Sequence, residues 1–179
     1  MIETHANPLA GSALACDCIV TMLNQRHIVH EIIAHAPVTT ARAAQSLALP
    51  YPEAQAVNLF LKDGAKAHYF LVVAHAGTHV DLKCLRTALH SARLSFAKPQ
   101  ELQEVLGLEP GAVTPLGTLA DTDHRTDVVI DQSFQHRLIG VHPCTNAATL
   151  YLCTDDLVHV LAEHGVHTIF LDMSSKPCT

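Results

Sequence analysis

The stretch Val57-Asn-Leu-Phe-Leu-Lys-Asp-Gly64, with Tyr69-Phe-Leu-Val-Val73 shortly after it, decides the fold. Both apolar runs have the length and composition of buried strands, and Asp63-Gly64 between them is a strong turn dipeptide. We therefore predict a β-hairpin over residues 57–73, with its turn lengthened toward Lys66.

Outward from this hairpin, short strands and helices are interspersed without a steady strand–helix–strand alternation. Asp81 is placed to cap one helix. A second helix can be capped by Thr154, together with Asp155 and Asp156. This order predicts a single α+β domain with a mixed, mostly antiparallel sheet and flanking helices. Helices are expected over residues 14–25, 41–47, 82–89, 100–106 and 154–164, and further strands over 30–34, 94–96, 128–131, 138–142, 148–153 and 168–171. The domain is expected over 14–173, after a lead-in of 1–13 and before a tail of 174–179.

Composition narrows the function classes. The 179 residues are 49% hydrophobic and 16% charged, enough for one buried core. A formal net charge of −6, 4% aromatic residues and no Trp argue against a protein that binds DNA or long RNA by itself. No apolar run reaches the roughly 18 residues of a membrane span. We expect no secretory signal, because the first residues include Glu3 and lack a basic region followed by a long apolar stretch. We expect a cytoplasmic protein without a membrane partner.

Cysteine and histidine are the residues that could suggest a metal. The six cysteines fit no zinc spacing and are expected to be reduced. The fourteen histidines include close pairs at 75/79 and 164/167, but no His-Glu-x-x-His motif or carboxylate cluster accompanies them. We expect neither a metal nor another cofactor. A histidine-rich metal-binding domain remains a remote alternative.

Three polar features could carry chemistry. Asn58 begins an otherwise apolar strand, the loop Gly111-Ala-Val-Thr-Pro115 could present backbone N–H groups to a carbonyl, and His142-Pro-Cys-Thr-Asn146 follows a strand. Each alone is more typical of a turn or a structural residue. The run Asp121-Thr-Asp-His-Arg125 has no nucleophile elbow before it, and we interpret it as a turn with an Asp–Arg contact.

Taken together and in order, these segments resemble the YbaK/ProX-type aminoacyl-tRNA editing domains, the free-standing relatives of the prolyl-tRNA synthetase editing insertion. The resemblance covers about residues 14–172 and is closest to the ProX-like branch, which resembles deacylases of alanyl-tRNA(Pro). The matching stretches are Val57-Asn-Leu-Phe-Leu-Lys-Asp63, Asp81-Leu-Lys83, Leu94-Ser-Phe96, Leu106-Gly-Leu-Glu-Pro-Gly-Ala-Val-Thr-Pro-Leu-Gly117, Asp121-Thr-Asp-His-Arg125, Val128-Val-Ile-Asp131, His142-Pro-Cys-Thr-Asn-Ala-Ala-Thr149 and Asp155-Asp-Leu157.

The resemblance implies a metal-free hydrolase that cleaves the ester of a mischarged tRNA carrying a small amino acid. Gly111, Pro115 and Asn58 match the positions expected to serve catalysis. Val57, His142, Asn146 and Thr114 match the expected substrate-binding positions. An aminoacyl ester is already activated, so positioned backbone donors and a bound water would suffice, and a tight pocket would exclude the larger correct amino acid.

One departure from the family pattern concerns Val57, because the family has a lysine directly before the asparagine. Lys62 is an odd number of residues away and is expected on the opposite face of the strand. The alternative is therefore a non-catalytic relative that binds an aminoacyl-like ligand, a tRNA end or a protein partner. Residues 62–98 hold six basic and two acidic residues, a net charge of +4, and we expect any contact with a tRNA acceptor end to be weak and local there. An aminoacyl-tRNA synthetase is a further expected partner.

Overall fold

The computed structural model describes residues 16–38, 47–64 and 68–173. The hairpin is confirmed as two long strands, β2 (Ala56–Asp63) and β3 (Tyr69–His75), which pair antiparallel with Asn58 opposite Val73. The turn toward Lys66 and the helix expected over 41–47 fall largely outside the described residues. So do the proposed lead-in of 1–13 and the tail of 174–179.

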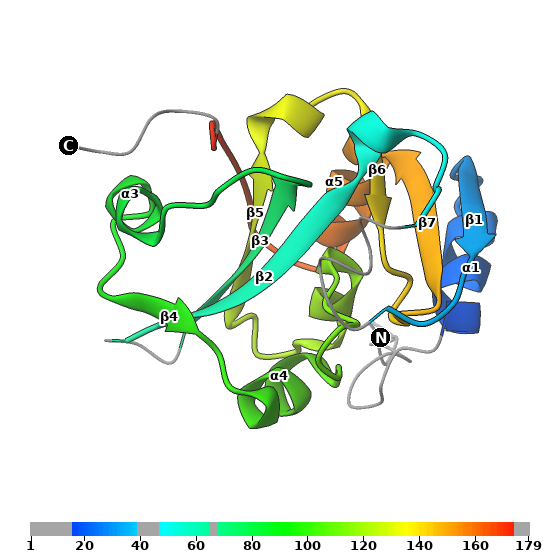
Figure 1. Ribbon diagram of the computed structural model, residues 1–179. Coiled ribbons are helices and arrows are strands. Elements are labelled where there is room, and N and C mark those ends of the chain that lie inside the picture. The colour runs from blue at the N-terminus through cyan, green and yellow to red at the C-terminus, as the bar shows by residue number, and fades with distance from the viewer. Residues whose placement is uncertain (1–15, 39–46, 65–67, 174–179) are drawn as a thin grey trace, which may run out of the picture.

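The expected α+β fold is confirmed, with its strands divided between two sheets (Figure 1). The larger has the order β4-β2-β3-β5-β8, with β4 (Leu94–Phe96), β5 (Thr126–Asp131) and β8 (Thr168–Leu171). β5 runs parallel to β3 and β8, which makes this sheet mixed. The smaller is antiparallel with the order β1-β7-β6, formed by β1 (His30–Ala34), β7 (Ala148–Cys153) and β6 (Leu138–Val141).

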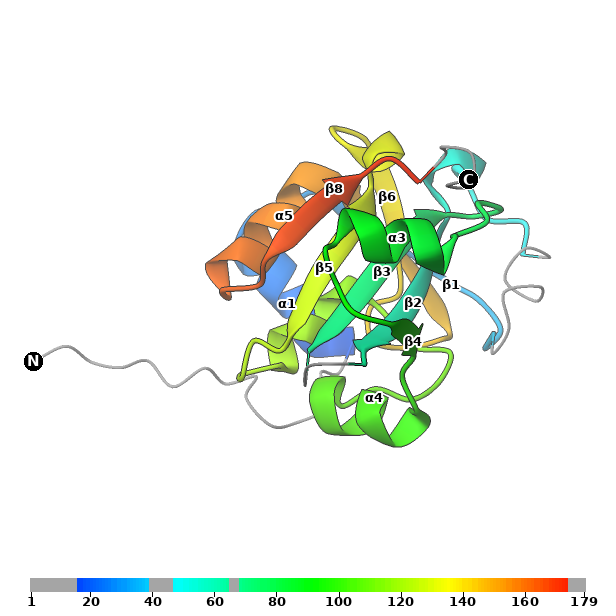
Figure 2. The ribbon, with the colours of Figure 1, turned by 90° about the vertical axis from the view of Figure 1, so that its left-hand side faces the viewer.

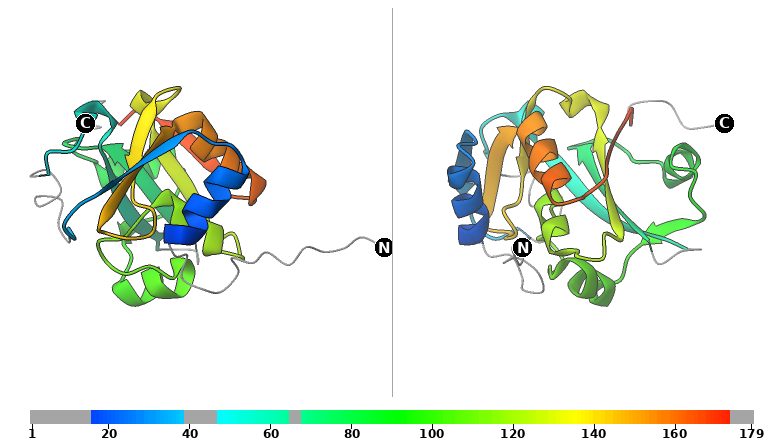
Figure 3. Two further views of the ribbon diagram at one scale, coloured as in Figure 1. Left: turned by 90° about the vertical axis from the view of Figure 1, so that its right-hand side faces the viewer. Right: turned by 180° about the vertical axis from the view of Figure 1, so that it is seen from behind.

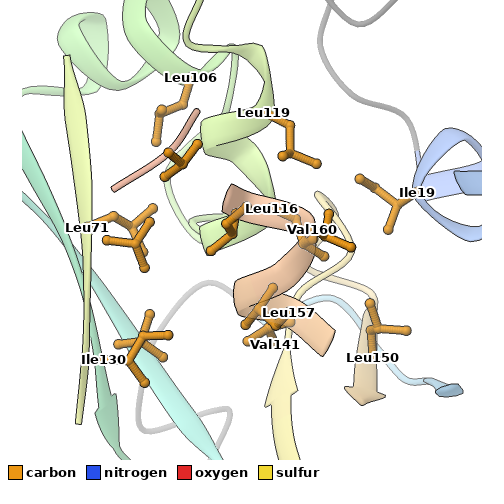
Figure 4. Packing of buried hydrophobic residues seen from close by; sticks show 14 of the residues in the cluster. Ile19, Leu71, Leu106, Leu116, Leu119, Ile130, Val141, Leu150, Leu157 and Val160 are labelled. Carbon is orange, nitrogen blue, oxygen red and sulfur yellow. The ribbon is translucent and has the colours of Figure 1, made fainter. Parts of the chain in front are cut away.

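Strand alternation divides the apolar residues of the larger sheet between its two faces. Phe60, Leu71 and Ile130 belong to the main core between the two sheets, where Leu150 comes from β7 (Figure 4). Three helices add to this core: α1 (Cys16–Gln25), which covers the smaller sheet, α4 (Pro99–Leu106), and α5 (Thr154–Glu163), which contacts both β7 and β8 (Figure 3).

The opposite face of the larger sheet is covered by α3 (Leu82–Ala88), which lies across the strands in Figure 2. Leu61 and Val72 pack there with Leu85 of α3 in a separate cluster. The fold thus places β2 between two apolar environments, and the parity of a residue on β2 decides which of them its side chain enters.

The helix caps test the local sequence rules. Asp81 caps α3 as predicted, because its carboxylate accepts from the N–H groups of Lys83 and Cys84 at 2.7 and 3.3 Å. The prediction for Thr154 is wrong, since Cys153 is the N-cap and makes no side-chain capping bond. The Thr154 N–H donates to Arg137 O at 2.9 Å, so the pairing of β7 with β6 continues for one more residue, into the first residue of the helix.

Two turns complete the framework of the site. The predicted loop over 111–115 ends in a 3-10 turn, η2 (Pro115–Ala120). A second one, η1 (Pro52–Ala54), leads into β2. The predicted Asp–Arg contact in the turn before β5 is present, with Arg125 Nε 3.6 Å from Asp123 Oδ2.

Candidate functional site

A small cavity of about 40 Å³ lies where β2 faces the smaller sheet. Its polar lining includes Asn58 from β2, His142 directly after β6, and Thr149 from β7. Apolar side chains complete much of the remaining wall, and they are those of Val38, Leu47, Leu49, Ala56 and Val141. Two of the sequence-predicted residues, Asn58 and His142, are therefore brought together although 84 positions separate them in the chain.

Asn58 links the cavity to the predicted loop. Its Nδ2 donates to Val113 O at 2.9 Å, which fixes the orientation of the amide because a carbonyl can only accept. The Oδ1 atom on the other side of the amide is buried and has no hydrogen-bond partner among the described residues. Buried acceptors are normally satisfied, so this atom marks a position where a ligand or water donor fits.

His142 presents its second ring nitrogen in a similar way. Its Nδ1 lies 3.0 Å from Ala148 O, so the proton is on Nδ1 and Nε2 carries a lone pair. Burial lowers the pKa of His142 below 6.5; the bond to Ala148 opposes this shift, and nearby His35 adds to it. The ring is therefore neutral at pH 7 and available as an acceptor.

Sequence reasoning missed three polar residues of the lining, His35, Gln55 and Thr149. His35 follows β1, and its ring centroid lies 6.4 Å from that of His142. The strand-end criterion that singled out His142 would also have found His35. No local signal marks Gln55 or Thr149, because the pairing of β1 with β7 and the approach of β2 to β6 bring them to the cavity.

The predicted loop over 111–115 contacts Asn58 but contributes no residue to the lining of the cavity. Gly111 has φ +92°, a conformation that favours glycine. The N–H of Ala112 donates to Glu109 O at 3.0 Å and is not available to a substrate. Thr114 is fully buried and caps η2 by accepting from the Leu116 N–H at 3.4 Å, and Pro115 is also buried. The loop reaches the cavity through its hydrogen bond to Asn58.

Asn146 lies apart from this cavity. It lines a larger hollow of about 320 Å³ that also includes Cys144, Gly107 and Glu109. The backbone carbonyl of Asn146 accepts from the Val38 N–H at 3.0 Å. Burial raises the pKa of the Cys144 thiol to about 12, so this group stays protonated and is a poor nucleophile at neutral pH.

Val57 is on the other face of the larger sheet from Asn58. It pairs with Ala74 and by alternation shares the face of Leu59 and Leu61, which pack toward α3. Lys62 has the parity of Asn58, as expected, but its ammonium is ion-paired with Glu101 of α4. The described residues thus place neither a lysine nor an arginine in the lining of the cavity.

Within residues 16–38, 47–64 and 68–173, no three His, Cys, Asp or Glu side chains are arranged to hold a metal ion. Over the same ranges, no helix is long and apolar enough to cross a lipid bilayer.

Comparison with known proteins adds independent information. The profile of the family described as "Aminoacyl-tRNA editing domain" matches residues 35–160. The chain is 34% identical to the prolyl-tRNA editing protein ProX of Acetoanaerobium sticklandii over 84% of its own length and 93% of that protein. It is 30% identical to prolyl-tRNA synthetase associated domain-containing protein 1 of mouse, over 92% and 99% of the two chains.

Among solved structures, one described as a candidate trans-editing enzyme for prolyl-tRNA synthetase superposes with a TM-score of 0.62. The match covers 88% of this chain and 96% of that one at 20% identity, so it supports the fold. The long family match and the identity to ProX go further: this chain is a member of the aminoacyl-tRNA editing domain family.

Proposed function

We propose that this protein hydrolyses the ester bond of mischarged tRNA that carries a small amino acid, with alanyl-tRNA(Pro) as the model substrate. The observation that carries this proposal is the small cavity that joins Asn58 and His142. At about 40 Å³ the cavity holds roughly three water molecules. This volume suits the small groups on the α-carbon of alanine and excludes larger side chains.

In the proposed reaction, water adds to the ester carbonyl, and the bond between that carbon and the ribose oxygen breaks. The products are a free amino acid and a tRNA with its terminal hydroxyl restored. Asn58, which the loop between Gly111 and Pro115 orients, holds the aminoacyl group in place, and His142 helps to shape the pocket. Positioning supplies much of the acceleration for such an activated ester.

The test is a deacylation panel with alanyl-, seryl-, threonyl- and cysteinyl-tRNA. We expect the wild type to cleave at least one of them, and Asn58→Ala to lower that rate roughly 5- to 100-fold, the equivalent of one buried hydrogen bond left unmade. Asn24→Ala is the matched control, because Asn24 is exposed on α1. A wild type that cleaves none of the four substrates contradicts the proposed activity.

Val57 supports a second candidate, a non-catalytic member that binds an aminoacyl-like ligand, a tRNA end or a protein partner. A valine offers no charge to the terminal nucleotide where the family pattern has lysine. The deacylation panel should therefore include Val57→Lys. An inactive wild type together with an active Val57→Lys variant favours this second function over the first.

A tRNA acceptor end and a prolyl-tRNA synthetase are the partners we propose, in keeping with the names of the relatives. Of the six basic residues in 62–98, Lys62 is ion-paired, and Lys83 and Arg86 are on α3, across the larger sheet from the cavity. Any contact of Lys83 and Arg86 with tRNA therefore lies away from the amino-acid pocket. Charge reversal of Lys83 and Arg86 should weaken tRNA binding without altering which amino acid is removed.

A further inference from the structure

The side chains that line the cavity direct their hydrogen-bond donors away from it. Asn58 donates from Nδ2 to Val113 O, and His142 donates from Nδ1 to Ala148 O. Gln55 donates from Nε2 to Pro50 O at 3.1 Å and to the Tyr151 hydroxyl.

His35 and Thr149 also direct their hydrogen-bond donors away from the cavity. The Nδ1 atom of His35 lies 2.9 Å from Ala36 O, so Nδ1 carries the proton and Nε2 has a lone pair. The Thr149 hydroxyl is 3.1 Å from that Nε2 and must donate to it. The Thr149 oxygen therefore keeps its acceptor capacity while its hydrogen is already used.

Three acceptors consequently remain on Asn58, His142 and Thr149: Oδ1 of Asn58, Nε2 of His142 and Oγ1 of Thr149. The first is buried without a partner among the described residues, and the other two belong to side chains whose donor hydrogen is already used. Among Asn58, His142 and Thr149, the second amide hydrogen of Asn58 is the one side-chain donor that has no assigned acceptor. A carboxylate or phosphate, which only accepts, would leave the acceptors unsatisfied and is a poor fit.

We propose that this cavity recognises the free α-amino group of an aminoacyl ester, whose ammonium form offers three N–H donors to the three acceptors. The inference rests on the proposed function and adds how the substrate is recognised: through its free amino group, which esters of α-hydroxy acids and of N-blocked amino acids lack. The α-amino group has no acceptor of its own when protonated, so it complements the lining.

Protonation of the pocket supports the same assignment. His142 is an acceptor only while its ring is neutral, and burial favours that neutral form. A protonated ring would turn Nε2 into a donor and place a positive charge beside the ammonium. Recognition should therefore weaken as the pH falls and His142 gains a proton.

The decisive experiment compares alanyl-tRNA with lactyl-tRNA, in which a hydroxyl replaces the amino group at nearly equal size. Each enzymatic rate is divided by the spontaneous hydrolysis rate of the same ester, because the ammonium itself activates the alanyl ester. We expect the normalised kcat/KM of lactyl-tRNA to be lower by about tenfold or more, since a hydroxyl offers one donor in place of three. Equal normalised values overturn the inference and leave the deacylase function intact.

A binding measurement decides the inference even if no ester is cleaved, which would contradict the proposed function alone. The probes are the alanyl and lactyl amides of 3′-amino-3′-deoxyadenosine, neither of which carries an ester to hydrolyse, titrated by calorimetry or NMR. Preference for the alanyl amide supports the inference, and equal affinity, or no binding of either probe, refutes it. Thr149→Val removes one acceptor at constant shape and should reduce the preference, whereas Thr21→Val on the exposed face of α1 should not.

Discussion

Gly140 of β6 lines the cavity and packs directly against the ring of Tyr151. A Cβ at position 140 would lie 2.7 and 3.1 Å from two ring carbons and 3.2 Å from Ala54 O. Carbon atoms pack at about 3.5 Å or more, so the ring must move by about 0.8 Å. Tyr151 is 1% exposed, and its hydroxyl donates to Pro50 O at 3.0 Å, which leaves the ring little room.

We therefore expect Gly140→Ala to cost about 1–3 kcal/mol of folding free energy, the usual range for overpacking. For a chain of this size that lowers Tm by roughly 2–12 °C. Thermal and urea unfolding measure the effect, and a double-mutant cycle with Tyr151→Leu identifies its cause. Free energies that add to within about 0.5 kcal/mol would show that the ring is not the obstacle and refute the reasoning.

Three further outcomes are expected. Because burial lowers the pKa of His142, the unfolded chain binds a proton more readily than the folded chain below pH 6.5. The free energy of unfolding of the wild type should therefore fall with decreasing pH in that window more than that of His142→Asn. Parallel pH curves of the two proteins in urea unfolding would contradict this. Exposed Cys18 should react with iodoacetamide well before Cys144, whose thiol pKa is about 12, and peptide mapping by mass spectrometry would expose the reverse order. Lys62→Met should change any deacylation rate by no more than about twofold, because the Lys62 ammonium is paired with Glu101 and does not line the cavity. A loss of rate as large as that of Asn58→Ala would instead show that Lys62 contacts the substrate.

The hairpin and most helix ends could be predicted because their causes are local. Asp63-Gly64 and the apolar runs around it specify β2 and β3, and the short side chain of Asp81 specifies the start of α3. Thr154 shows the limit of such rules. The residue type suits a cap, but the hydrogen bond to Arg137, the residue directly before β6, is a tertiary contact that moves the cap to Cys153.

The candidate site was predictable only in part, for the same reason. Asn58 and His142 stand out as polar residues at strand ends, but nothing local separates them from Thr114, which is buried and caps η2. Thr149 reaches the cavity through the register of β7 against β1. Val57 and Asn58 are neighbours in sequence, yet the pleat of the strand directs them to opposite faces of the sheet.

The pairing of β1 with β7 also has a consequence for how the site forms during synthesis. His30 of β1 lies opposite Leu152, and the hydrogen bond from Thr149 to His35 joins residues 114 positions apart. A ribosome must therefore release nearly the whole chain before this wall of the cavity can close. Nascent fragments that end before β7 lack this wall, so the proposed recognition of an aminoacyl group depends on the synthesis of β7.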